Sequence, residues 1–227
     1  MRKLIKDFVS IAATTLPIRG PIYEFGALQV PGQEGFADLR PFFPQHEYVG
    51  TDMREGPGVD KLLDLHDIDL PSDSVGTILC FDTLEHVEYP HRALEQIHRV
   101  LKPDGIAVIS SVMDFPIHDY PYDYWRFTPE AFKSILKPFN GSFVGFAGRE
   151  DFPNTVIGIG FKGVVPQLSE FKIKYEEWKE FQWKELQKSQ EEVSSLIRMV
   201  KFLTPPIFYT ALSGIYKALS GTRKRTP

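Results

Sequence analysis

The sequence predicts an α/β fold built on a doubly wound, mostly parallel sheet that is closed by an antiparallel hairpin. Short apolar segments recur in the first half of the chain, and most are bounded by glycine, proline or aspartate, as buried parallel strands are. Helical patterns separate several of these segments, which is the alternation typical of βαβ units. Two later apolar stretches, residues 142–148 and 155–163, predict the hairpin. Such a sheet binds ligands at the carboxyl ends of its strands.

The elements of the predicted sheet follow in chain order. We expect parallel strands over residues 21–25, 47–52, 60–65, 76–81 and 106–112. A helix is expected over residues 89–101, because its apolar residues fall on one face. A second helix, over residues 129–139, begins with Thr128 as its N-cap and Pro129 in its first turn.

The chain divides into three predicted parts. Residues 1–20 form an amphipathic helix, residues 21–165 form the α/β domain, and residues 166–227 form a helical extension. The stretch from residue 169 to 203 lacks glycine and proline, which predicts one long helix or two in series. Residues 203–227 place apolar side chains near one helical face and end in a basic tail. That segment fits a helix that contacts anionic lipid, or one that docks on the domain or on a second chain.

Composition excludes several classes of protein. The chain has 227 residues, of which 42% are hydrophobic and 25% charged, which is ordinary globular composition. A net charge of −4 gives no basis for nucleic-acid binding. Cys80 is the only cysteine, so no internal disulfide can form, and we expect a cytoplasmic protein without a spanning helix. Contact with the inner face of the membrane through residues 203–227 stays open, and the sequence does not determine the oligomeric state.

The ends of the first two strands predict a cofactor site. Gly26 follows the first strand, where a missing side chain lets the backbone approach a ligand. Glu24, in the strand end, can accept hydrogen bonds from loop amides or from a ligand ammonium group. Asp52 ends the second strand roughly 26 residues after Gly26, near the spacing at which an acid reaches a ribose diol. An acid after the third strand, Asp64 or Asp67, can accept from an adenine amine while a neighbouring amide reaches the ring.

The fourth and fifth strands carry a family resemblance. The segment "LPSDSVGTILCFDTLEHVEYPHRALEQIHRVLKPDGIAVISS" resembles class I S-adenosylmethionine-dependent methyltransferases, especially the small-molecule group with the Leu-Glu-His-Val signature. The resemblance covers roughly residues 22–162 and implies a Rossmann-like methyltransferase sheet with S-adenosylmethionine as the cofactor. The cofactor-binding residues that we assign with it are Glu24, Gly26, Asp52, Met53, Asp64, Leu65 and Asp82.

The first glycine motif departs from the family pattern. The family has Glu-x-Gly-x-Gly-x-Gly, whereas this chain keeps Glu24 and Gly26 and has Leu28 and Val30 at the other glycine positions. A side chain at the middle position lies where the methionine part of the cofactor comes close to the backbone. Leu28 and Val30 therefore either reshape that end of the site or close it.

The stretch "HDYPYDYWRFTPEAF" resembles a subgroup that is linked to saccharide or cell-envelope chemistry. Its aromatic and polar side chains can stack on a sugar or bind an acidic group. The substrate-binding residues that we predict are Tyr122, Tyr124, Trp125 and Arg126. In the alternative, Trp125 and Phe127 are core residues and Arg126 pairs with a nearby acid.

Methyl transfer to an alcohol requires a base that removes the proton of the acceptor. The candidates are His118, in the loop after the fifth strand, His86 and Asp82, with His118 preferred and His86 assigned mainly to orienting its loop. We expect no metal site, because a capping turn explains the cluster of His66 and its neighbouring acids.

Three functions remain open from the sequence. The first is an S-adenosylmethionine-dependent methyltransferase that acts on a small molecule, a glycan or a cell-envelope precursor. The second is a methyltransferase-like interaction module without activity, which the degenerate glycine motif favours. The third is a nicotinamide-dependent reductase or epimerase, which lacks the Gly-x-Gly-x-x-Gly loop here.

Overall fold

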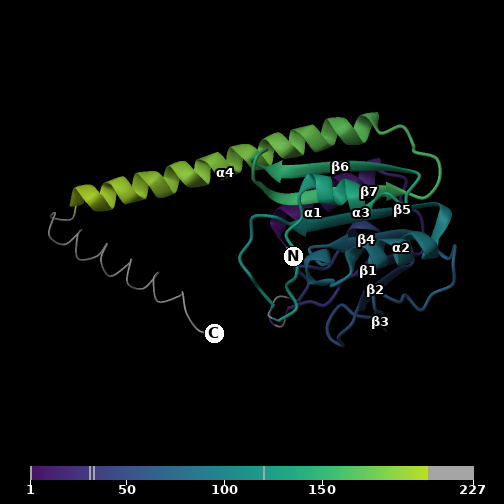
Figure 1. The fold of residues 1–227 in the computed structure, drawn as a ribbon. Helices are drawn as coiled ribbons and strands as arrows, with labels where there is room; N and C mark the ends of the chain where they lie inside the picture. The colour runs from purple at the N-terminus through teal and green to yellow at the C-terminus, as the bar shows by residue number, and fades with distance from the viewer. Residues whose placement is uncertain (1, 31, 33, 120, 204–227) are drawn as a thin grey trace. The chain divides into compact units, whose positions relative to one another are not determined.

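The computed structural model describes residues 2–30, 32, 34–119 and 121–203. Its strands form one seven-stranded sheet in the order β3-β2-β1-β4-β5-β7-β6, which can be followed across Figure 1. The strands are β1 (Ile22–Phe25), β2 (Tyr48–Asp52), β3 (Lys61–Leu62), β4 (Val75–Phe81), β5 (Leu101–Val112), β6 (Gly141–Gly148) and β7 (Pro153–Phe161). The helices are α1 (Lys3–Thr15), η1 (Arg40–Phe42), η2 (Leu84–His86), α2 (Pro90–Val100), α3 (Pro129–Ile135) and α4 (Ser169–Leu203).

The sheet is parallel except at one strand. β1 pairs in parallel with β2 and with β4, and β4 pairs in parallel with β5. β7 runs antiparallel to both β5 and β6, so β6 and β7 form the predicted hairpin. The predicted α/β fold, with its doubly wound sheet and closing hairpin, is confirmed.

Strand register brings three predicted site residues to one edge of the sheet. Phe25 in β1 lies opposite Thr51 in β2 and opposite Cys80 in β4. The residues that follow these positions therefore emerge together at the carboxyl ends of the strands. They are Gly26, Asp52 and, after Phe81, Asp82.

Each face of the sheet is covered by its own hydrophobic core. On one face, apolar residues of β1, β4 and β5 pack against α2 and α3, as with Leu94 and Phe132. On the other face, the sheet packs against α1 and the first part of α4, as with Phe8 and Phe171. The sheet is thus buried on both sides, which leaves its carboxyl edge for ligands.

Several boundaries differ from the sequence prediction. β3 is only two residues long, because the chain turns at Asp64, whose side chain accepts a hydrogen bond from the backbone N–H of His66 (2.8 Å). β5 begins at Leu101, which pairs with Val75 ahead of an irregularity that shifts the register. α3 begins as predicted, with the Thr128 hydroxyl accepting from the Ala131 N–H (3.1 Å), but it ends at Ile135.

The C-terminal part contains one long helix, α4, rather than two. The chain splits into two compact units between Trp183 and Lys184, and the structure describes the second unit only as far as residue 203. The predicted lipid-contacting segment, residues 203–227, lies almost entirely outside the described residues. Among the helices of the described ranges, none has the length and apolar character needed to cross a membrane.

Candidate functional site

The turn after β1 requires glycine. Gly26 has φ of +84°, a conformation that residues with a side chain rarely adopt. A Cβ at this position would overlap the side chain of Thr83, which follows β4. The amides of Gly26 and Ala27 both donate to the carbonyl of Thr51, at 2.9 and 3.0 Å. The turn is therefore packed between the ends of β2 and β4.

Glu24 is a buried carboxylate directly before this turn. It is only 4% exposed, and its Oε2 accepts a hydrogen bond from the hydroxyl of Tyr48 in β2, at 2.7 Å. Burial raises the pKa of Glu24 to about 7, although the Tyr48 hydrogen bond and the charge of Arg40 act in the opposite direction. Glu24 can therefore change charge near neutral pH, at the place where a cationic group of a ligand would be stabilised.

Leu28, at the second glycine position of the family motif, is accommodated by a glycine of the neighbouring loop. A side chain at Gly56 would overlap Leu28, and one at Gly58 would overlap the carbonyl of Ala27. The backbone N–H of Gln29 donates to the carbonyl of Pro57 at 2.8 Å, and this bond joins the two loops. The loop after β1 thus packs along the loop after β2. Among the residues between β1 and β2 that the structure describes, η1 is present and there is no α-helix.

The acids at the ends of β2 and β3 each keep one oxygen available. Oδ1 of Asp52 accepts from the backbone N–H of Arg54 at 3.0 Å, and Oδ1 of Asp64 accepts from His66. Within the described part of the chain, Oδ2 of each acid has no hydrogen bond. Met53 is 66% exposed, whereas Leu65 is buried. These residues lie at the end of β2 or shortly after β3, and their contact with a nucleoside stays a prediction.

Asp82 is held by the start of the chain, which the sequence did not reveal. Arg2 donates from Nε and Nη2 to the two oxygens of Asp82, at 3.0 and 2.8 Å. The Ser110 hydroxyl also donates to Asp82, at 3.0 Å, and Asp82 has a φ of +47°. The carboxylate that we assigned to the cofactor, and considered as a base, is thus neutralised by Arg2 in this structure.

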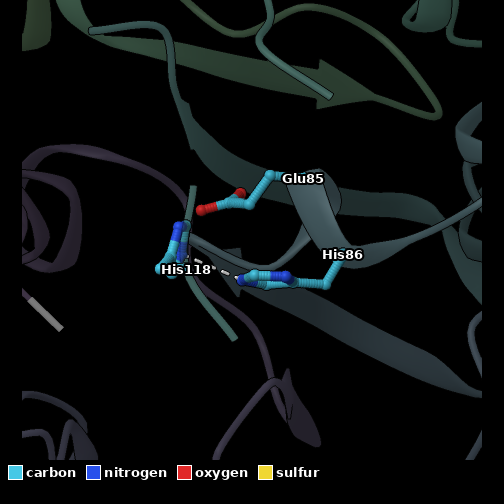
Figure 2. Close-up of side chains that lie close together, drawn as sticks. All are labelled: Glu85, His86 and His118. Atoms are coloured by element: carbon cyan, nitrogen blue, oxygen red, sulfur yellow. Dashed lines mark hydrogen bonds between the residues drawn. The ribbon is translucent and has the colours of Figure 1, made fainter. Parts of the chain in front are cut away.

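A cluster of three ligand-type side chains lies beside this pair. Glu85 and His86 belong to η2, after β4, and His118 belongs to the loop after β5. One oxygen or nitrogen atom of each lies within 4.8 Å of the others, and the two histidine Nε2 atoms are 3.1 Å apart. Figure 2 shows Glu85 and His86 extending from the same short helix toward His118. The structure therefore brings together both histidines that the sequence put forward.

Each member of this cluster is held by a further group. Nδ1 of His86 lies 2.7 Å from the carbonyl oxygen of Tyr122. Nδ1 of His118 lies 3.2 Å from the carbonyl oxygen of Pro116 and 3.3 Å from Oδ2 of Asp123. These contacts fix the orientations of both imidazole rings.

Glu85 is fully buried, and only one of its two carboxylate oxygens has a hydrogen-bond partner among the described residues. Its Oε2 accepts from the Ser111 hydroxyl at 2.7 Å, whereas Oε1 has no hydrogen bond among the described residues. Burial, together with the charge of Asp82, raises the pKa of Glu85 to about 7. In the sequence, Glu85 is only one letter of the Leu-Glu-His-Val signature. Its burial beside two histidines is a tertiary feature that the signature does not reveal.

The Arg126 side chain forms its hydrogen bonds within the loop after β5. Its Nε and both terminal nitrogens donate to Asp123 and to the carbonyls of Phe115, Pro116 and Trp125. These five bonds use all five N–H donors of the guanidinium. The Arg126 hydrogen bonds hold the pKa of Asp123 well below its usual range. The predicted alternative, in which Arg126 pairs with a nearby acid, describes this geometry.

The aromatic residues of the same loop divide between core and surface. Phe127 is buried, whereas Tyr122, Tyr124 and Trp125 are 63%, 41% and 43% exposed. The Trp125 ring is nevertheless anchored, because its Nε1 donates to the carbonyl of Val87 at 3.0 Å. Backbone amides of Tyr124 and Trp125 donate to the carbonyl of Glu85, which ties the loop to η2.

A separate cavity lies at the opposite edge of the sheet. It has a volume of about 450 Å³ and is open to solvent, and its lining includes Arg19, His46, Lys102 and Asp104. Its charged groups are already paired: Arg19 contacts Asp104 at 3.0 Å, and Lys102 donates to the Gly20 carbonyl at 3.0 Å. The cavity has none of the predicted site residues in its lining, so we place the candidate site at the carboxyl edge.

Comparisons with known proteins agree with this fold. Residues 46–109 match the methyltransferase domain family. A 1,6-didemethyltoxoflavin-N1-methyltransferase of Burkholderia thailandensis, solved with bound 1,6-didemethyltoxoflavin and S-adenosylhomocysteine, is 18% identical with a TM-score of 0.54. The alignment covers 71% of this chain and 79% of that one. A SAM-dependent methyltransferase of Thermotoga maritima is 17% identical with a TM-score of 0.52, over 70% of this chain and 90% of that one.

These likenesses concern the fold. The chain spans about half of two structures that it matches, 46% of the citrinin polyketide synthase CMeT domain and 51% of the CurJ carbon methyltransferase. No curated protein matches the sequence. The resemblance to class I S-adenosylmethionine-dependent methyltransferases is confirmed by the family match and by these two folds.

Proposed function

We propose that this chain is an S-adenosylmethionine-dependent methyltransferase that acts on a small molecule or a saccharide. The observation that carries the proposal is the conjunction of Gly26 and Asp52 at adjacent strand ends of a methyltransferase-type sheet. The family match, which begins just before β2 and extends into β5, supports S-adenosylmethionine as the cofactor.

The residues at the carboxyl edge fit this cofactor chemically. Asp52 would accept from the ribose hydroxyls through its unused Oδ2, and Asp64 would accept from the adenine amine. Met53 and Leu65 adjoin these acids in the chain, and Glu24 adjoins the turn at Gly26. Both carboxylate oxygens of Asp82 already bind Arg2, so any contact of Asp82 with the cofactor would use the same oxygens. We therefore give Asp82 a minor role in cofactor binding.

Acceptor binding is assigned to the loop after β5. The exposed faces of Tyr122, Tyr124 and Trp125 offer stacking surfaces for a sugar or another flat ligand. Arg126 has no donor left for the acceptor, so its proposed role is to hold this loop in place. The loop is fixed to η2, which puts the acceptor surface beside His86 and His118.

The cofactor supplies an activated methyl group on a sulfonium. The chain must align the acceptor with that methyl group, which leaves the sulfur while the sulfur keeps the bonding electron pair. A hydroxyl acceptor must also lose its proton, and His118 is the proposed base. His118 would be oriented through its Nδ1, which lies against the carbonyl of Pro116 and the carboxylate of Asp123, and the Nε2 atom of His86 lies 3.1 Å from that of His118.

Calorimetric titration with S-adenosylmethionine tests the proposal. Wild-type protein should bind the cofactor, and Asp52→Ala should weaken binding by about tenfold or more, since two ribose hydroxyls lose their acceptor. Asp69→Ala is the matched control, because Asp69 is an exposed acid in the neighbouring loop after β3. Absence of binding by the wild type would overturn the proposal.

A further inference from the structure

We propose that Glu85, His86 and His118 form a site for a divalent transition-metal ion, with Oε1 of Glu85 and the two histidine Nε2 atoms as its ligands. The three residues converge from η2 and from the loop after β5, as Figure 2 shows. This departs from the expectation of no metal site, which considered only the cluster around His66. Glu85 and His86 are neighbours in the sequence, but His118 lies 32 residues further on, and only the fold brings it to this pair.

The spacing of the ligand atoms fits one ion. Metal–nitrogen distances near 2.0–2.1 Å place two ligand nitrogens roughly 2.9–3.4 Å apart, from octahedral to tetrahedral angles. The Nε2 atoms of His86 and His118 are 3.1 Å apart. The carboxylate ligand atom of Glu85 lies within 4.8 Å of both. Small movements of three side chains would therefore complete the coordination.

The outer contacts fix which nitrogen of each histidine is available. Nδ1 of His86 faces the carbonyl oxygen of Tyr122, so it must carry the proton and donate. Nδ1 of His118 faces the carbonyl of Pro116 and the carboxylate of Asp123, so it must donate as well. In each neutral imidazole, Nε2 then has the free lone pair. Metal-binding histidines have this arrangement, with the second nitrogen bonded to a carbonyl or a carboxylate.

Two facing lone pairs repel unless a cation lies between them. A proton shared by the two Nε2 atoms would relieve this repulsion, but it would leave Oε1 of Glu85 without a partner. That oxygen belongs to a side chain with 0% exposure and has no hydrogen bond among the described residues. An unpaired buried acceptor is costly, and a bound cation would satisfy it together with both imidazoles. The unpartnered carboxylate oxygen therefore favours a metal ion over a shared proton.

The ligands are held in place before any ion binds. The Ser111 hydroxyl fixes Oε2 of Glu85, and two backbone amides of the loop donate to the Glu85 carbonyl. The Arg126–Asp123 pair supports the segment that carries His118. Two imidazoles and one carboxylate suit Zn²⁺, Mn²⁺, Fe²⁺ or Co²⁺, and they leave coordination positions open.

The open positions suggest a role that rests on the proposed methyltransferase function. The oxygen of a hydroxyl acceptor would bind there, and coordination would let its proton pass to solvent water before the oxygen attacks the methyl group. The cation would then replace His118 as the means of activating the acceptor, because it takes up the lone pair that a base needs. The acceptor class narrows to hydroxyl compounds, among which saccharides fit the exposed aromatic faces nearby.

Metal binding is tested on the full chain after removal of bound metals with a chelator. Wild-type protein should bind one equivalent of Co²⁺ with visible d–d absorption, and Zn²⁺ should displace it. We expect His86→Ala, His118→Ala and Glu85→Gln each to weaken Co²⁺ binding by about tenfold or more. His91→Ala is the matched control, since His91 is an exposed histidine in α2 that lies outside the cluster. Circular-dichroism melting establishes that each variant is folded, and the isosteric Glu85→Gln provides a ligand change with little change in shape.

Two results would overturn the metal site. One is a folded wild-type protein that binds neither Co²⁺ nor Zn²⁺, and the other is Co²⁺ binding that stays unchanged in the folded His86→Ala/His118→Ala double variant. A parallel titration with S-adenosylmethionine separates this inference from the proposed function. Cofactor binding without metal binding refutes the metal site alone, whereas Co²⁺ binding that depends on the cluster supports the site even if the cofactor does not bind.

Discussion

The hydroxyl of Tyr48 in β2 donates a 2.7 Å hydrogen bond to the buried carboxylate of Glu24 in β1. The two strands are adjacent and parallel, so this bond joins them just before the turn at Gly26. Tyr48 is the only hydrogen-bond donor to the Glu24 side chain among the described residues. The contact therefore makes Glu24 easier to ionise at the edge of the proposed cofactor site, in opposition to the larger effect of burial.

Tyr48→Phe should destabilise the protein most where Glu24 is ionised. The variant leaves a buried carboxylate without its donor, which should cost about 1–3 kcal/mol at pH 8 and less at pH 5. Chemical denaturation at both pH values measures the difference. Tyr23→Phe is the control, because the Tyr23 hydroxyl makes no hydrogen bond among the described residues. An equal loss at both pH values in Tyr48→Phe would contradict the assignment.

Glu24 should make stability depend on pH between about 4.5 and 7. Its pKa is raised from 4.5 to about 7 in the folded chain, so the folded state holds the proton more tightly than the unfolded state. This contribution is fully present below pH 4.5 and is lost as pH rises through about 7, with a total on the order of 3 kcal/mol.

Burial and three neighbouring groups set the pKa of Glu24. Tyr48, Arg40 and Asp38 face the Glu24 carboxyl group, and burial has the largest effect. In Glu24→Gln the free energy of unfolding should fall less steeply with pH than in the wild type. Burial also raises the pKa of Glu85 to about 7, so part of the pH dependence of the unfolding free energy should remain in this variant. Identical slopes for wild type and variant would show that Glu24 does not titrate in this range.

Gly26→Ala should destabilise the folded protein for two reasons, and the two contributions can be measured separately. Gly26 has a positive φ, and a Cβ there would also overlap Thr83. We expect a loss of about 2–4 kcal/mol, together with weaker S-adenosylmethionine binding. Gly35→Ala is a matched control, because Gly35 has φ of +83° but open space around its Cβ position. Thermal melting that shows equal losses for both variants would exclude the steric contribution of Thr83.

Arg2→Ala should destabilise the domain by leaving a partly buried carboxylate unpaired. The Asp82 side chain is 14% exposed and is bound by Arg2 through both oxygens. The expected cost is roughly 1–3 kcal/mol in chemical denaturation. Lys3→Ala is the control, since its pair with Asp7 lies on the surface. Equal stability of Arg2→Ala and Lys3→Ala would mean that the ion pair contributes nothing.

Local patterns predicted most of the fold. The strands follow from short apolar segments, and the start of α3 follows from Thr128, whose hydroxyl bonds the Ala131 amide as a cap does. Two predicted boundaries failed, one because of a local turn and one because of a tertiary pairing. β3, for example, is short because of the turn at Asp64, and β5 is long because Leu101 pairs with Val75.

The candidate site was harder to predict because its contacts join distant segments. The sequence pointed to His86 and His118 separately, but their meeting requires η2 and the loop after β5 to converge. Arg2 and Asp82 are 80 residues apart, and no pattern in the chain connects them. The importance of Glu85 rests on its burial, which a signature motif does not reveal.

The central claim is that S-adenosylmethionine binds at the carboxyl edge of the sheet, and a crystal structure with S-adenosylhomocysteine tests it most directly. Density should place the ribose beside Asp52 and the adenine near Asp64, with the turn at Gly26 against the rest of the ligand. The claim would be contradicted if neither co-crystallisation nor soaking with excess ligand gave density at this edge. Density in the cavity lined by Arg19 and Lys102, at the opposite edge, would contradict it equally.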